Sequence, residues 1–140
     1  MQKELPNKVL FFHEYRSCAF PREKLTETAD IFYRTEKKLR DRGVNVILCS
    51  DYTIRKLNRK YRNADRTTDV LSFPFEDADL LGEVYISLQR AAVQARRYNV
   101  PYADEVNRLF IHGLAHLLGF DHTTERERKK MELYEKRYYT

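Results

Sequence analysis

Three of the four histidines of this 140-residue sequence fall within the stretch IHGLAHLLGFDH. His112 and His116 are four residues apart, a spacing that places both imidazoles on one face of an α-helix. Gly119 favours the left-handed turn that ends many helices, so the chain can fold back and bring His122 toward the pair. Three converging imidazoles are typical of a tetrahedral zinc site with an open fourth position. The sequence therefore predicts one zinc ion bound by His112, His116 and His122.

Two other interpretations of these histidines stay open from the sequence alone. They could be ordinary side chains on a helix surface, although three in so short a stretch, with a glycine suitably placed, argue against it. They could also form a purely structural metal site, which normally has a fourth protein ligand, often a cysteine. Cys18 and Cys49 are distant in sequence, and spacing does not exclude them. His13, at the end of a short apolar run, is better explained as a partly buried or surface side chain than as a further ligand.

The histidine stretch can be compared with two known patterns. Metzincin proteases carry H-E-x-x-H-x-x-G-x-x-H, in which the glutamate is the general base acting on zinc-bound water. Gly113 stands at the glutamate position here, so the ligand spacing is kept and the protease's base is absent. A second pattern, H-G-x-x-H-L-x-G-[YF]-D-H, is matched in full, and this resembles the YbeY family of bacterial endoribonucleases. The matching residues are His112, Gly113, His116, Leu117, Gly119, Phe120, Asp121 and His122.

An upstream stretch supports the same resemblance. Members of the YbeY family carry a sequence similar to N-x-x-[YF]-R-x-x-D-x-x-T-[DN]-V-L-S-F-P. Thr67 replaces the proline that commonly precedes the threonine of this pattern. A shorter family segment, G-[DE]-[IV]-x-I, is matched by residues 82–86, with Glu83 in place of the commoner Asp. The residues that match the longer pattern are Asn58, Tyr61, Arg62, Asp65, Thr68, Asp69, Val70, Leu71, Ser72, Phe73 and Pro74.

The resemblance implies a function for the whole chain. It implies a zinc-dependent endoribonuclease that cleaves single-stranded RNA. The implied role is ribosomal RNA maturation and ribosome quality control, and the implied partners are ribosomal RNA and the small ribosomal subunit. Two alternatives remain. One is a metal-dependent hydrolase of a peptide or small molecule, which Gly113 and the basic character of the chain disfavour. The other is a non-catalytic metalloprotein that binds the ribosome.

Two further residues of these motifs are candidates for roles at the site. Arg62 is the predicted catalytic residue, because a guanidinium stabilises the negative charge that builds on phosphoryl oxygens during phosphodiester cleavage. A structural ion pair, with Asp65 for example, is the alternative for Arg62. Asp121 could orient a metal ligand or simply cap the turn.

Composition limits the setting in which the protein works. A net charge of +5 and a pI near 9.2 favour an anionic partner, and the segment from Arg55 to Arg66 concentrates the positive charge. No apolar run approaches the roughly 18 residues of a membrane span, and the N-terminus lacks a secretory signal. Two distant cysteines suggest reduced thiols, so we expect a cytoplasmic protein without membrane contact. The length predicts a single domain, residues 1–140.

The helices and strands that must position these residues can be predicted from the periodicity of apolar residues and from the residues that typically end or cap such elements. The order βαβαββααα indicates an α+β fold, a small mixed β-sheet packed with helices, with a zincin-like site on a helix and the loop after it. We expect Pro74 to place its strand at a sheet edge, and Gly43, Asp51, Ser87 and Thr124 to end or cap helices. The predicted strands are 9–12, 44–49, 70–75 and 82–86, and the predicted helices cover about 22–39, 51–61, 87–98, 102–118 and 124–138.

Overall fold

The computed structural model describes residues 8–37, 42–64 and 67–139. The described residues form a four-stranded sheet of β1 (Val9–His13), β2 (Gly43–Cys49), β3 (Val70–Pro74) and β4 (Leu80–Ser87), in the order β1-β2-β4-β3. The first, second and fourth strands are parallel, and β3 runs antiparallel to β4 at one edge. Pro74, which has no N–H to donate, ends this edge strand as predicted.

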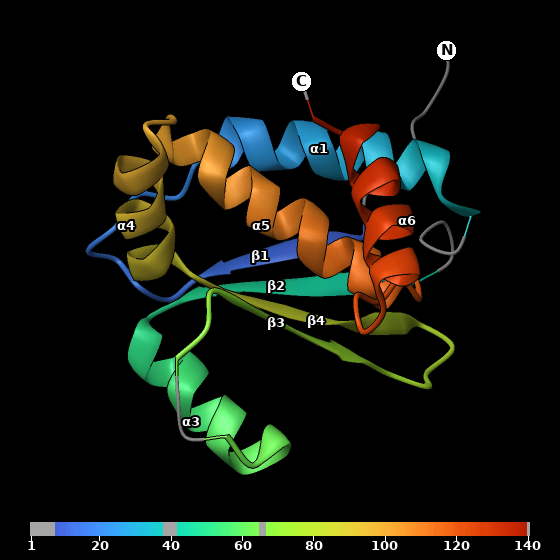
Figure 1. The fold of residues 1–140 in the computed structure, drawn as a ribbon, viewed down its shortest axis with the longest axis horizontal. Helices are drawn as coiled ribbons and strands as arrows, with labels where there is room; N and C mark the ends of the chain where they lie inside the picture. The colour runs from blue at the N-terminus through green and yellow to red at the C-terminus, as the bar shows by residue number, and fades with distance from the viewer. Residues whose placement is uncertain (1–7, 38–41, 65–66, 140) are drawn as a thin grey trace.

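The helices lie in two unequal layers on the sheet. Four of them cover one face: α1 (Arg22–Thr35), α4 (Leu88–Tyr98), α5 (Tyr102–Leu117) and α6 (Glu125–Lys136). Among the described helices, only α3 (Asp51–Arg62) lies against the other face (Figure 1). The predicted α+β class and the predicted order of elements are confirmed. None of the described helices combines the length and the apolar character that crossing a bilayer requires.

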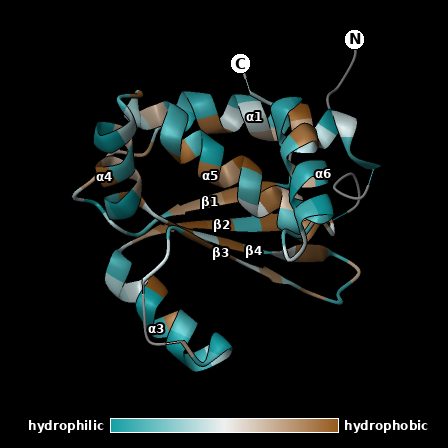
Figure 2. Cartoon of the chain, in the orientation of Figure 1, coloured by the Kyte–Doolittle hydropathy of each residue, from teal (hydrophilic) through white to brown (hydrophobic). Residues whose placement is uncertain are grey.

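The two layers are held by cores of different size. The main core lies between the sheet and the four-helix layer, with α5 at its centre, and includes fully buried Phe32, Phe110 and Leu114. A small second cluster joins the sheet to α3 through Ile47, Cys49, Ile54 and Leu71. Figure 2 shows the apolar strands between these layers. A helix in the large core is fixed on several sides, whereas α3 depends on few buried contacts.

The ends of two helices differ from the predictions. Ser50, and not Asp51, is the N-cap of α3, because its hydroxyl accepts from the backbone N–H of Thr53 at 3.2 Å. Asp51 instead accepts a hydrogen bond from Ser87 at 2.7 Å and pairs with Arg90 at 3.2 Å, which ties α3 to α4. Gly43 does not end the first helix but begins β2.

The other predicted caps are present. The hydroxyl of Ser87 accepts from the N–H of Arg90 at the start of α4, and Thr124 accepts from Glu127 at the start of α6. In β2, Gly43 sits so close to Lys8 that an added Cβ would lie 2.9 Å from the Lys8 carbonyl oxygen, which explains a glycine there. The first helix is predicted to continue toward Leu39, but α1 ends at Thr35. Leu39 itself lies outside the described residues.

Candidate metal centre

The turn after α5 brings the third histidine back toward the other two. Gly119 has φ of 104°, a region that side chains other than glycine rarely adopt. The N–H of Gly119 donates to the carbonyl of His116 at 3.0 Å, and the N–H of Phe120 donates to Ala115 at 3.1 Å. These two bonds form the Schellman motif that ends many helices. The predicted reversal at Gly119 is therefore confirmed, and its consequence is that the chain carrying His122 returns along the end of α5.

The three imidazoles form a compact group. A ring nitrogen from each of His112, His116 and His122 lies within 4.8 Å of the others, and the ring centroids are 4.8–5.7 Å apart. Burial, followed by the charges of His112 and His122, lowers the pKa of His116. Neutral imidazole is the form that binds a metal, so the lowered pKa favours the binding form of His116. These three nitrogen donors suit a single zinc ion.

Behind the cluster stands a carboxylate that no sequence motif indicated. Glu135 of α6 lies 2.6 Å from Nδ1 of His112, through its Oε2. The Glu135 side chain is only 9% exposed. A carboxylate accepts here, so the contact suits the neutral tautomer of His112 that carries its proton on Nδ1 and has the lone pair on Nε2. Metal-binding histidines usually have such a partner, which fixes both the tautomer and the ring orientation.

Other residues considered from the sequence lie apart from this group. Cys49 is buried in the cluster under α3, where burial is the main cause that raises its pKa to about 12. Cys18 lies in the loop after β1, where its carbonyl accepts from Nε2 of His13 at 2.8 Å. Neither cysteine nor His13 belongs to the histidine group of the described residues. The carboxylate of Asp121 accepts from the backbone N–H of His122 at 2.7 Å, so it holds the turn that carries this histidine.

Gly113 packs against the sheet and does not face the cleft. A Cβ added at this position would lie 2.5 Å from Cγ1 of Val84 and 3.3 Å from both Cγ2 of Val70 and Oγ of Ser72. Real side-chain atoms do not approach so closely, so even alanine would push α5 away from β3 and β4. The position at which metzincins carry their catalytic glutamate has no room for one here. Close packing of a helix on a sheet therefore excludes the protease's base.

Arg62 lies at the last turn of α3 and reaches the edge strand. Its Nη2 donates to the backbone carbonyl of Ser72 at 2.8 Å, and its guanidinium lies 5.4 Å from the centroid of the Phe73 ring. The hydroxyl of Ser72, in turn, donates to the carbonyl of Gly113 at 2.9 Å. Ser72 thus connects Arg62 to the helix that carries His112 and His116. The suggested partner Asp65 lies outside the described residues.

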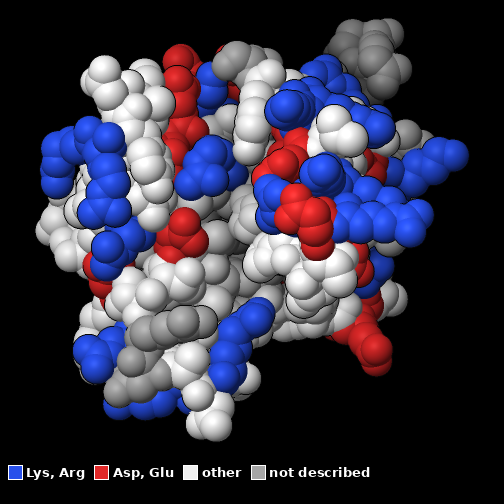
Figure 3. Space-filling view, in the orientation of Figure 1, with Lys and Arg blue, Asp and Glu red and all other residues white. Residues whose placement is uncertain are grey.

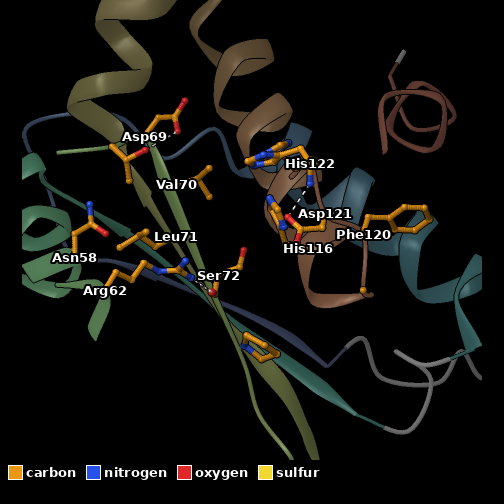
Figure 4. Close-up of a pocket in the computed structure, with 14 residues that line it drawn as sticks. Asn58, Arg62, Asp69, Val70, Leu71, Ser72, His116, Phe120, Asp121 and His122 are labelled. Atoms are coloured by element: carbon orange, nitrogen blue, oxygen red, sulfur yellow. Dashed lines mark hydrogen bonds between the residues drawn. The ribbon is translucent and has the colours of Figure 1, made fainter. Parts of the chain in front are cut away.

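A cleft of about 570 Å³ joins the two motifs of the sequence. The histidines and Asp121 line one wall, and Arg62 and Asn58 line the other, with the edge strand β3 between them. In Figure 4, Arg62 points toward Ser72 from one side, while His116 and His122 lie on the opposite side. The structure therefore brings together the residues that the sequence predicted for the metal and for phosphate chemistry.

Comparisons with known proteins place this arrangement in a family. The sequence profile of the family described as Endoribonuclease YbeY matches residues 15–140. A protein of that name from Acholeplasma laidlawii is 38% identical over 126 residues, which cover 89% of this chain and 88% of the relative. One from Thermotoga maritima is 39% identical over 115 residues, covering 82% and 72%. The solution structure of a Thermotoga maritima protein matches with a TM-score of 0.66 and 32% identity, covering 94% of this chain and 86% of that one.

Proposed function

The chain belongs to the YbeY family of endoribonucleases, and from this premise we propose that it is a zinc-dependent endoribonuclease that cleaves single-stranded ribosomal RNA. Its role would be ribosomal RNA maturation and ribosome quality control, with the small ribosomal subunit as partner. One observation supports this function above the others. A single cleft is lined both by three converging imidazoles and by an arginine that sits beside an exposed strand edge. Such a pairing suits an anionic phosphodiester.

His112, His116 and His122 would hold the zinc ion. Their nitrogens converge, and the lowered pKa of His116 favours the neutral form. When bound, zinc supplies a Lewis acid that polarises a phosphoryl oxygen and lowers the pKa of water. Glu135 would orient His112 by accepting its Nδ1 proton, so that Nε2 is presented to the ion.

Arg62 would stabilise the negative charge that builds on the phosphoryl oxygens. One of its N–H groups is used by the carbonyl of Ser72, which holds the side chain at the cleft wall. A guanidinium has five N–H donors in a planar fork, so the group can contact a phosphate while keeping this anchor. Because the charge develops only during cleavage, Arg62 would act mainly on the transition state.

The helix that carries Arg62 has features that favour an anionic substrate. On α3, which carries Arg62, cationic residues outnumber the single acidic residue, Asp51. The aromatic rings of Tyr52 and Tyr61 on the same helix are 69% and 60% exposed. Cations that contact phosphates and exposed rings that stack on bases are the usual features of single-strand recognition. The two free cysteines fit a reducing compartment such as the cytoplasm.

The peptide-hydrolase alternative is disfavoured by the packing of Gly113, and a non-catalytic ribosome-binding role predicts RNA binding without cleavage. Purified protein should be given structured ribosomal RNA and, separately, a peptide library, each with and without a chelator. Metal content should be measured on the same sample. We expect chelator-sensitive RNA cleavage, about one zinc per chain, and intact peptides. Cleaved peptides with intact RNA, or RNA bound and never cut, would contradict the proposed function.

A further inference from the structure

A second cavity lies on the other side of Phe120 from the histidine cleft. Its volume is about 650 Å³, and the end of α1 and the outer side of α6 form its walls. Lys37, Lys130 and Arg137 line it. In Figure 3, Lys and Arg side chains gather over α6, with acidic groups among them. The proposed cleavage chemistry uses none of these three cations.

The negative charge in this cavity is already engaged by hydroxyl donors. Glu36 also lines the cavity, and its carboxylate accepts hydrogen bonds from the hydroxyls of Tyr134 and, at 2.8 Å, Tyr138. These bonds tie α1 to α6 and direct the carboxylate into the protein. Three cations against one internally bonded carboxylate leave the cavity with an excess of positive charge. An anion is therefore the ligand class that it favours.

Apolar side chains accompany the cations. Leu118 and Leu133 line the same cavity, and Leu133 is 66% exposed, so the cavity offers apolar surface beside its cations. The ring of Phe120 stacks on that of Tyr134 at 4.3 Å between centroids. A small inorganic anion would make no use of these groups. A nucleotide chain offers both phosphates for the cations and base faces for the apolar and aromatic surfaces.

The cavity and the cleft share one lining side chain. Phe120 lines both, and it lies in the turn between His116 and His122. An RNA strand that places a phosphate at the histidines would therefore have only to extend past Phe120 to meet the cations of this cavity.

We propose that the cavity between α1 and α6 binds the part of the single-stranded RNA that flanks the cleaved phosphate, with Lys130 and Arg137 contacting its phosphates. This rests on the proposed function and extends it, because it adds a binding site for RNA beyond the cleft. The affinity for long strands would then come partly from α6, while the chemistry stays at the histidines and Arg62.

Two double variants with equal charge changes test the proposal. Lys130→Gln/Arg137→Gln removes two cations that line the cavity, and Arg126→Gln/Lys129→Gln removes two exposed cations of the same helix that do not. Binding of single-stranded RNA oligonucleotides of about 4 to 16 nucleotides, a range that single-strand binding sites span, should be measured in chelator over a range of salt concentrations. Chelator prevents cleavage, so the measurement reports binding only.

The expected result is specific to length and position. For the long strand, the cavity variant should bind several-fold more weakly, and its slope of log affinity against log salt should fall by about 1.4, since each phosphate contact to a single strand contributes about 0.7. For the short strand it should match the control variant. Equal losses in both double variants, or none in either, would overturn the cavity proposal while leaving RNA cleavage by the wild type intact. A wild type that neither binds nor cleaves RNA would overturn the proposed function, and the cavity proposal with it.

Discussion

The two walls of the cleft are built differently. The histidine wall rests on α5, in the centre of the main core, and a Schellman turn and a buried carboxylate hold its imidazoles. The arginine wall rests on α3, which a small cluster attaches to the sheet, and Arg62 itself is exposed. A metal site needs several atoms held in one geometry before the ion arrives. A group that meets charge developing on a substrate needs only one anchor and access to the cleft, which the bond to Ser72 provides.

Ser72 is the point at which the two walls meet. Its carbonyl accepts from Arg62, and its hydroxyl donates to Gly113 of the histidine helix. The residue is buried, and the edge strand that contains it lies between α3 and α5. One residue of the edge strand therefore contacts both the arginine and the histidine helix.

The largest effect is expected on the histidine wall. Replacing a ligand, as in His116→Ala, leaves two imidazoles, so zinc should fall well below one per chain by metal analysis, and RNA cleavage should be lost with it. His13→Ala is the matched control, because His13 bonds to the Cys18 carbonyl and lies outside the cluster, and it should keep its zinc. Stoichiometric zinc in single alanine variants of His112, His116 and His122 would place the metal elsewhere.

Replacing Arg62 on the arginine wall should lower RNA cleavage without reducing the zinc content. Arg62→Ala should lower the cleavage rate at saturating RNA on the order of a hundredfold, as expected when one charge-stabilising donor is removed. Arg62→Lys should recover little, because an ammonium does not reproduce the guanidinium fork. Lys60→Ala removes a cation of the same helix that does not line the cleft, so it controls for the loss of positive charge and should keep the cleavage rate at saturating RNA. A folded, zinc-loaded Arg62→Ala protein with normal cleavage would reduce Arg62 to a structural residue.

A smaller effect on zinc affinity is expected when Glu135, which contacts His112, is changed instead of a histidine. Glu135→Gln keeps the shape of the side chain but loses its charge, so zinc affinity measured by chelator competition should fall about 10- to 100-fold. Glu132→Gln changes an exposed carboxylate of the same helix, and its affinity should equal that of the wild type. A structural role for Glu135 would instead lower the melting temperature of the metal-free protein and leave the zinc affinity unchanged.

The mildest change tests how tightly the histidine helix is packed. Gly113→Ala places a methyl group against Val84 and Ser72, so the free energy of unfolding should drop by about 1–3 kcal/mol, the usual cost of overpacking. Chemical denaturation measures it. Lys60→Ala on α3 should change stability little, because its side chain is exposed. An unaffected Gly113→Ala would mean that α5 does not press on the sheet as the structure shows.

Local rules let the sequence determine much of this protein. The spacing of His112 and His116, the turn at Gly119 and the edge position of Pro74 depend on periodicity and on backbone geometry within a few residues, and the structure confirms each. The binding of zinc and the role of Arg62 stay predictions. At the start of α3 the predicted N-cap, Asp51, was wrong, and Ser50 is the cap. Both residue types cap helices well, and only the partners of Asp51 at the start of α4 distinguish the two.

Only the tertiary structure determines which residues surround the three histidines. Glu135 follows His112 by 23 positions and belongs to another helix, so no spacing rule connects them. The contact of Gly113 with Val84 and the bridge through Ser72 likewise depend on how one face of α5 packs on a strand far away in sequence. Short-range patterns specify which residues share a face of a helix or strand. Which faces pack against each other depends on the burial of apolar area across the whole chain. This packing places the Glu135 carboxylate beside His112 and leaves no room for a glutamate at position 113.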